Sequence, residues 1–180
     1  MRVSQDVEIT PTSVVLNGTP VAVSETGGKM LVELYRRYTG DYPKFFKMDT
    51  LSRLGFIAAE MLFKQSDISS QVSAVILANR SASIKNDNDY LATISKGNYY
   101  PSPALFVYTL PNIVTGEIAI RHHIQGETSF YILDKPEQLK PIVEATVNPD
   151  STPSTCVLAG WCECSKADTF YAKLQIIWNN

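Results

Sequence analysis

The chain has 180 residues and a mass of 20.0 kDa, which is enough for one domain with a sizeable core and short for two. Apolar residues make up 44% of the sequence and charged residues 19%, as in ordinary soluble globular proteins, so a largely disordered or fibrous chain is excluded. We therefore expect a single domain over residues 1–180.

Charge and the amino-terminal sequence indicate which partners to expect. The net charge is -2, the isoelectric point is near 5.7, and the longest basic cluster is Arg36-Arg37, so the chain lacks the positive patch of nucleic-acid-binding proteins. The start lacks the pattern of a signal peptide, and no run approaches the ~20 apolar residues of a membrane span. We expect a cytoplasmic protein without nucleic acid, membrane span or cofactor.

The first part of the chain predicts a hairpin and then a helix. Residues 1–23 contain short β-type runs, and Asn17-Gly18 between two of them predicts a tight hairpin turn. Apolar residues from Met30 to Tyr38 recur at helical spacing, and Gly40 ends the pattern.

The middle of the chain predicts a long helix followed by a buried strand. Residues 50–66 place their apolar side chains on one helical face, and Asp49 is positioned to cap that helix. Residues 72–79, VSAVILAN, form an apolar run rich in β-branched residues, which is typical of a strand buried on both faces. This order indicates an α/β sheet.

The rest of the chain alternates between helix and strand signals. Residues 80–89 are typical of a loop and 89–97 of a short helix, whereas 113–124 fit either a helix or a strand. Residues 129–133 predict a strand, and a helix capped by Asp134 is predicted from residue 135. Pro136 is tolerated in the first turn of such a helix, whereas Pro141, further inside, weakens the prediction because it removes a hydrogen bond. The chain closes with two β-type runs, at 154–164 and 170–178.

Four segments in this order resemble a known family. They are MDTLSRLGFIAAEML at 48–62, VSAVILANRSASIKNDNDY at 72–90, SPALFVYTLPNIVTGEIAIRHHIQGETSFYI at 102–132, and CVLAGWCE at 156–163. Together, over residues 48–164, they resemble the amino-terminal half of β-ketoacyl-acyl-carrier-protein synthases (3-oxoacyl-ACP synthases). The resemblance implies one half of a thiolase-like α/β fold, a mixed sheet flanked by helices, here with a short amino-terminal hairpin.

The family's nucleophile is absent at the position where the resemblance places it. In the family, a Cys lies at the sharp turn between a strand and a buried helix, where the helix amino terminus lowers the pKa of its thiol. Here that turn reads Asp134-Lys135-Pro136, without Cys, Ser or Thr. A carboxylate or an ammonium cannot replace a thiolate in acyl transfer, and Lys135 could act only if deeply desolvated. The family's other catalytic residues come from a carboxy-terminal half that this sequence does not contain, so we expect no catalytic residue.

Other reactive residues have more ordinary interpretations. His122 and His123 are adjacent, so their side chains diverge, and a structural or surface role is favoured. Cys156, Cys162 and Cys164 fit small apolar strand residues better than a metal or redox site, although a cysteine hydrolase that pairs one of them with a histidine is an alternative.

One loop carries residues suited to binding. Tyr100, Phe106 and Tyr108 surround a Pro-containing apolar stretch that leads to Asn112, and these four could line a groove for an acyl chain or a partner. Packing in the core is the alternative for about half of the aromatic residues.

The sequence therefore predicts a non-catalytic ketosynthase-like accessory or interaction protein. The resemblance implies a fatty-acid, polyketide or aryl-polyene-type assembly system, with a ketosynthase, an acyl carrier protein or a second copy as partner. The alternatives are a small acyl-thioester enzyme that uses one of the three cysteines and a structural, oligomerising domain.

Overall fold

The protein forms a seven-stranded mixed sheet in the order β3-β2-β1-β7-β6-β4-β5. The computed structural model describes residues 1–66, 68–94, 97, 100–147 and 156–179. Its strands are β1 (Arg2–Ile9), β2 (Val14–Leu16), β3 (Thr19–Pro20), β4 (Val72–Asn79), β5 (Glu127–Ile132), β6 (Cys156–Lys166) and β7 (Thr169–Trp178). β4 pairs in parallel with β5 and β6, and every other pairing is antiparallel.

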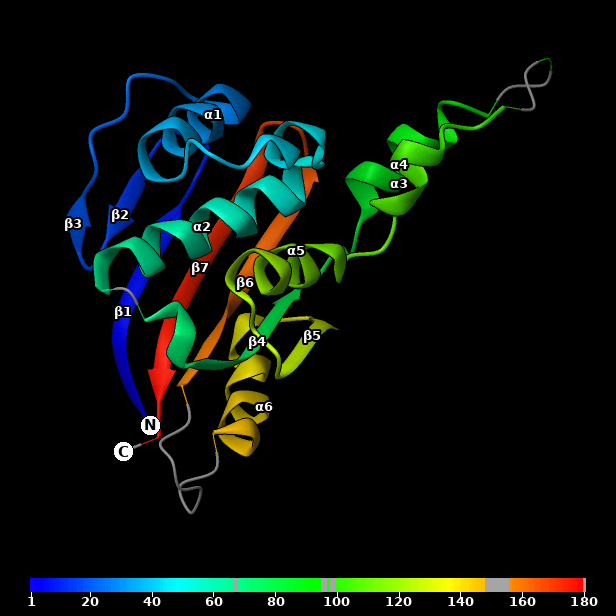
Figure 1. Cartoon of the computed structure of the whole chain (residues 1–180). Coiled ribbons are helices and arrows are strands. Elements are labelled where there is room, and N and C mark those ends of the chain that lie inside the picture. Colours follow the sequence, from blue (N-terminus) through cyan, green and yellow to red (C-terminus); the bar gives the residue numbers. More distant parts are fainter. Residues whose placement is uncertain (67, 95–96, 98–99, 148–155, 180) are drawn as a thin grey trace.

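Helices cover the two faces of the sheet unequally (Figure 1). α1 (Gly27–Tyr38), α2 (Thr50–Ser66) and α5 (Ile113–His122) contribute to the larger core on one face. Among the described helices, only α6 (Leu139–Thr146) contributes to the core on the other face. Three short 3-10 helices, η1 (Pro43–Lys47), η2 (Ser69–Gln71) and η3 (Pro136–Gln138), join these elements. The predicted α/β class, a mixed sheet flanked by helices, is confirmed.

A separate pair of helices extends away from this body. α3 (Ile84–Leu91) and α4 (Pro103–Val107) project to one side beyond the end of β4, and we call them the arm (Figure 1). Inside the arm, the Asn86 side chain donates a hydrogen bond to the Leu105 carbonyl at 2.8 Å. The Ser83 hydroxyl donates to the Thr109 carbonyl at 2.6 Å, which holds the base of the arm.

The positions of α5 and α6 follow from the handedness of parallel connections. From β4 the chain moves outward through α5 to β5, and from β5 it returns through α6 past β4 to β6. Crossovers between parallel strands are almost always right-handed, so two crossovers in opposite directions place their helices on opposite faces. This is why α6 lies alone on the second face.

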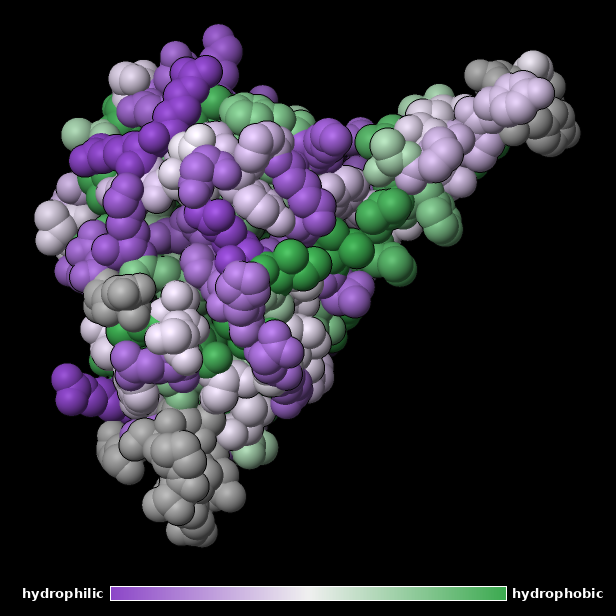
Figure 2. Space-filling view, viewed as in Figure 1, coloured by the Kyte–Doolittle hydropathy of each residue, from purple (hydrophilic) through white to green (hydrophobic). Residues whose placement is uncertain are grey.

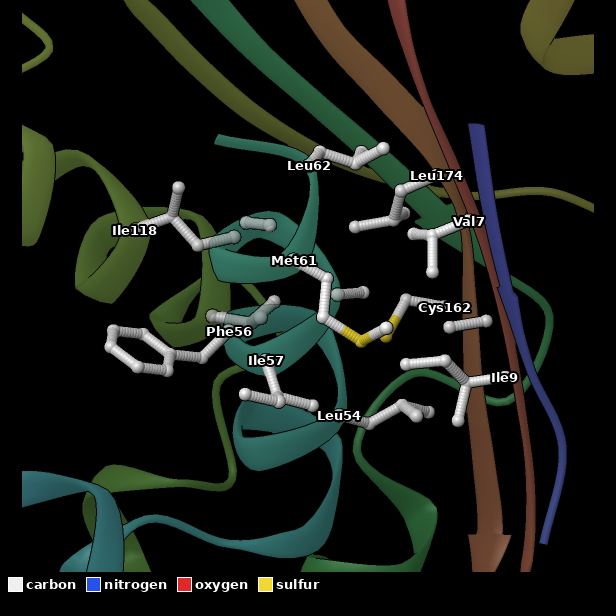
Figure 3. Close-up of a cluster of buried hydrophobic side chains, with 14 of the residues drawn as sticks. Val7, Ile9, Leu54, Phe56, Ile57, Met61, Leu62, Ile118, Cys162 and Leu174 are labelled. Carbon is white, nitrogen blue, oxygen red and sulfur yellow. The ribbon is translucent and has the colours of Figure 1, made fainter. Parts of the chain in front are cut away.

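The larger core is centred on α2 (Figure 3). Leu54, Ile57 and Met61 point from this helix toward the sheet, where they meet side chains such as Ile9 and Cys162. All five are fully buried. Burying a large aliphatic side chain contributes about 1.5–3 kcal/mol, so α2 is the main anchor of the fold.

The second face is apolar only over the parallel strands. Ile76 of β4 and Val157 of β6 are buried against Val143 of α6. By contrast, Lys173 of β7 is exposed and forms an ion pair with Glu8 of β1, with its Nζ atom 3.5 Å from a carboxylate oxygen. Parallel strands are buried on both faces, whereas antiparallel strands tolerate one wet face. The antiparallel half of the sheet therefore needs no second helix layer.

Several predicted elements are confirmed with their local causes. Asn17 and Gly18 both have positive φ, 51° and 74°, as a tight hairpin turn requires. Asp49 caps α2, because its carboxylate accepts the Ser52 N–H at 3.0 Å. The run at 72–79 is β4, buried between two parallel neighbours.

Other boundaries were predicted wrongly. The helix expected at 89–97 begins at Ile84 and ends at Leu91. It starts earlier than predicted because hydrogen bonds within the arm outweigh the loop-like composition of residues 80–89. Residues 95–96 of the expected helix lie outside the described part. The segment that fitted either helix or strand is the helix α5. The helix expected from 135 starts as the 3-10 helix η3, which is capped by Lys135 rather than Asp134. Pro141 lies in the first turn of α6, where a missing N–H costs little stability.

We predict that Gly126→Ala destabilises the protein. A Cβ atom at Gly126 would lie 1.7 Å from the backbone oxygen of Ser73, so the start of β5 would have to move away from β4. We expect the free energy of unfolding to fall by about 1–3 kcal/mol, as overpacking does elsewhere. Urea denaturation measures this change.

Gly116→Ala is the matched control. A Cβ atom at Gly116, inside α5, meets no atom within 4 Å, so this variant should be neutral or more stable by about 0.5–1 kcal/mol. Equal effects of the two variants would contradict the role given to Gly126.

Candidate functional site

The carboxyl ends of the parallel strands form the candidate site. Ligands in open α/β sheets bind beyond these ends. Here Glu163 of β6 accepts two hydrogen bonds from the loop after β4, one from the Arg80 N–H at 2.9 Å and one from the Ser81 hydroxyl. The Asn79 side chain closes the same loop by bonding both backbone groups of Ala82, which has a left-handed conformation with φ of 49°.

The segment after β5, where the family resemblance places a nucleophile, has no Cys, Ser or Thr. Asp134, Lys135 and Pro136 are all exposed. Lys135 is therefore not desolvated as a nucleophilic amine must be. Its N–H donates to the Gln138 side-chain oxygen at 2.9 Å, and Pro136 has no N–H, so neither backbone is available to stabilise an oxyanion.

The site also contains the hydroxyl of Ser81, which the sequence did not indicate as a site residue. Its hydrogen-bond partner is the carboxylate of Glu163, and the two histidines of the chain, His122 and His123, lie elsewhere in the sequence. A serine nucleophile needs a base such as histidine within reach. The Ser81–Glu163 contact is therefore best explained as a loop anchor. The small-residue loop after β4 is the only signal in the sequence that could have indicated it.

Both histidines lie at the opposite, amino-terminal edge of the parallel strands. His122 ends α5, and its Nε2 atom is 2.5 Å from the Glu60 carboxylate of α2, with its ring packed edge-on against Phe63 at 4.5 Å. His123 is exposed, has a φ of 55° and caps α5. Neither can reach the end of β5, and their side chains have different neighbours.

A buried charged cluster surrounds His122. The carboxylates of Glu60 and Glu117 are only 6% exposed. Glu117 pairs with Lys44 at 2.8 Å, and this hydrogen bond raises the pKa of the Lys44 ammonium. Arg121 pairs with Asp41 at 2.7 Å. These pairs tie the segment before α2 to α5, so the cluster stabilises the fold and no spacing in the sequence indicates it.

The three cysteines are buried thiols. All three belong to the larger core, with Cys162 and Cys164 on one face of β6, as expected, and Cys156 at the other end of the same strand. Burial raises the pKa of Cys156 to about 11 and of Cys164 to about 12, and raises that of Cys162 well above its usual value. All three stay protonated at neutral pH, which argues against a thiol-dependent acyl-thioester enzyme.

Within the described part of the chain, no group of three or more His, Cys, Asp or Glu residues is arranged to hold a metal ion. The same residues include no helix long and apolar enough to cross a membrane. The cytoplasmic location stays a prediction.

The structure separates the four residues of the predicted groove. Tyr100 is 87% exposed, and Phe106 is 55% exposed on α4 with its ring 5.4 Å from that of Tyr90. Tyr108 instead packs against the larger core, and burial raises the pKa of its phenol. Asn112 is exposed at the start of α5. Phe106 belongs to the surface of the arm and Tyr108 to the body.

Comparison with known proteins identifies the class of fold. No family model matches the sequence, and no curated protein matches it. A solved structure, described as the ketosynthase ApeO in complex with its chain length factor ApeC from Xenorhabdus doucetiae, contains a similar chain with a TM-score of 0.65. The match has 13% identity and covers 97% of this chain and 77% of that one. The protein thus has a ketosynthase-type, thiolase-like fold, as its sequence predicted.

We predict that His122→Ala destabilises the protein. The substitution leaves the buried Glu60 carboxylate without its imidazole partner and removes the contact with Phe63. The free energy of unfolding should fall by about 1–3 kcal/mol, which urea denaturation measures. The control, His123→Asn, keeps a residue that tolerates left-handed backbone and should change it by less than about 0.5 kcal/mol. An unchanged free energy of unfolding in His122→Ala would contradict a structural role for His122.

We also predict that the folded protein resists thiol reagents. Near pH 8 the three protonated, buried thiols should react with iodoacetamide at least about a hundredfold more slowly than in urea, because only the thiolate reacts. Mass spectrometry of timed samples counts the labels. If a cysteine of the folded protein reacts as fast as free cysteine, the result would support the alternative of an acyl-thioester enzyme that uses a thiol.

Proposed function

We propose that this protein is a non-catalytic, ketosynthase-like subunit that pairs with a condensing ketosynthase in a polyketide-type or related acyl assembly system. The observation that carries the proposal is the end of β5. The fold of a condensing enzyme presents Asp134, Lys135 and Pro136 there, exposed and without a nucleophile or a free oxyanion donor.

The comparison supports a partner of this kind. The similar chain comes from a complex in which a ketosynthase is bound to its chain length factor. The alignment covers nearly all of this chain and about three quarters of that one, so the matched chain is only moderately longer. A short ketosynthase-type chain in a two-subunit complex is the arrangement that we propose here.

The arm offers an apolar surface for that partner. Four large apolar residues on the arm and directly after it are each about half exposed, namely Leu91, Phe106, Val107 and Leu110. Figure 2 shows a hydrophobic band that runs from the region of α5 onto the arm. Contiguous apolar surface of this kind marks interaction sites on soluble proteins.

The edge strand β5 adds a second element to the same proposal. β5 is the last strand of the sheet and pairs only with β4. Its six residues, ETSFYI, contain no Pro or Lys, the residues that commonly protect an edge from pairing with another chain. Ile132 at its end is 51% exposed. The edge is therefore open to a strand of the partner.

A binding experiment with designed variants tests the proposal. The purified protein is mixed with the ketosynthase encoded in the same system, and complex formation is followed by analytical ultracentrifugation. We expect a complex with a Kd of about 10 µM or tighter. Phe106→Glu and Ile132→Glu should each weaken it at least about tenfold, because each buries an unpaired charge in the interface.

Phe46→Glu is the control, since Phe46 is 50% exposed but lies on η1, outside the arm and β5. Circular dichroism checks the folding of all variants. The acyl carrier protein, which the family resemblance implies as a further partner, is tested in a parallel titration. The absence of any complex at tens of micromolar with either protein would overturn the proposal.

The open edge of β5 also favours one second candidate, an oligomerising domain that pairs with its own copy. The same centrifugation run without partner tests it. A dimer that Ile132→Glu dissociates, together with no binding to the ketosynthase, would select this alternative.

A further inference from the structure

The second face of the sheet contains a groove beside α6. One wall is the side of α6 that carries Leu139 and Val143, and Trp161 of β6 and Ile177 of β7 contribute to the floor. The groove has a volume of about 410 Å³, within the range of roughly 300–1,000 Å³ of small-molecule sites. It lies on the face opposite α1, α2 and α5.

The lining of the groove is apolar at its base and cationic at its rim. The side chains of Leu139, Val143 and Ile177 offer only hydrocarbon. Among the described residues that line it, the charged side chains are Lys140 and Lys173, and none is a carboxylate. Tyr171 and Gln175 add uncharged polar groups. A ligand inside would thus meet mainly apolar walls, a few uncharged polar groups and two lysine ammonium groups.

The two lysines are available to an anion. Lys140 lies 3.9 Å from Glu144, and Lys173 lies 3.5 Å from Glu8. All four side chains are at least 37% exposed. Exposed pairs of this kind hold their partners weakly, and neither glutamate lines the groove.

We propose that this groove binds a single-chain amphiphilic anion, with an aliphatic chain between α6 and the sheet and an anionic head group, such as a carboxylate, at Lys140 and Lys173. The side of the groove formed by Leu139, Val143 and Ile177 favours a hydrocarbon chain, because a polar group placed against these side chains would lose its water without a partner. The rim selects a negative head by charge complementarity. The groove lies on the second face of the sheet, and Pro136, next to the end of β5, belongs to its lining. The proposal is argued from the lining of the groove and does not require the partner subunit.

Two tryptophans on opposite faces make the proposal testable by fluorescence. The chain has two Trp residues. Trp161 lines the groove, whereas Trp178 packs against the core of the other face and donates a hydrogen bond to the Ser4 hydroxyl at 3.1 Å. A bromine atom on an alkyl chain quenches an indole only when the two are in contact. Trp178→Phe therefore isolates the emission of Trp161, and Trp161→Phe isolates that of Trp178.

The probe is 11-bromoundecanoic acid, used below its micelle concentration with the protein alone. With Trp178→Phe we expect saturable quenching with a Kd below about 100 µM. With Trp161→Phe the quenching should be at least about fivefold smaller, since Trp178 does not line the groove. No saturation, or equal quenching of the two indoles, would overturn the site.

The head group is tested with 11-bromoundecanol, the neutral probe of equal length. We expect it to bind at least about fivefold more weakly than the acid. The double variant Lys140→Gln and Lys173→Gln should remove this preference, whereas Lys47→Gln and Lys64→Gln, outside the groove, should keep it. Equal binding of acid and alcohol to the unmodified chain would overturn the anionic part of the proposal.

Discussion

The position of β4 between two parallel strands is the constraint on which the rest of the structure depends. Parallel neighbours cannot be joined by hairpins, so the chain must leave and return through helices. The outward step through α5 and the inward step through α6 then place helices on opposite faces. β4 is buried on both sides as a result, and its continuous run of apolar residues is the sequence expression of that burial.

The parallel arrangement of β4 and β5 also places different groups at the two ends of these strands. The carboxyl ends of β4 and β5 carry the loop anchored by Glu163 and the segment from Asp134 to Pro136, where the family resemblance places a nucleophile. The amino ends carry His122, held by the buried Glu60. The imidazole and the hydroxyl of Ser81 are thus at opposite ends of the strands, and no hydrolase site can be assembled from them.

The antiparallel half of the sheet has a different consequence. The antiparallel strands β7 and β1 can expose one face to solvent. Among the described helices, α6 therefore has no neighbour on that face, and the groove forms along its side. The arm and the open edge of β5 lie away from this groove. We therefore propose two different surfaces, the arm with the edge of β5 for a protein partner and the groove for an amphiphilic ligand.

The sequence by itself determined the elements whose signals are local. The helix α2 with its cap at Asp49 and the turn at Asn17 and Gly18 both depend on side chains a few residues apart. The thiolase-like class was also accessible, because four phrases occur in the right order and the comparison of folds agrees.

Only the tertiary structure decided the rest. The start of α3 depends on Asn86 meeting Leu105, and the candidate site depends on Ser81 meeting Glu163, 82 positions away. The groove is lined by residues of α6 and of β1, which are more than a hundred positions apart in the chain. Periodicity and turn chemistry act between near neighbours in sequence, whereas hydrogen bonds, ion pairs and burial between distant segments exist only once the sheet has brought those segments together.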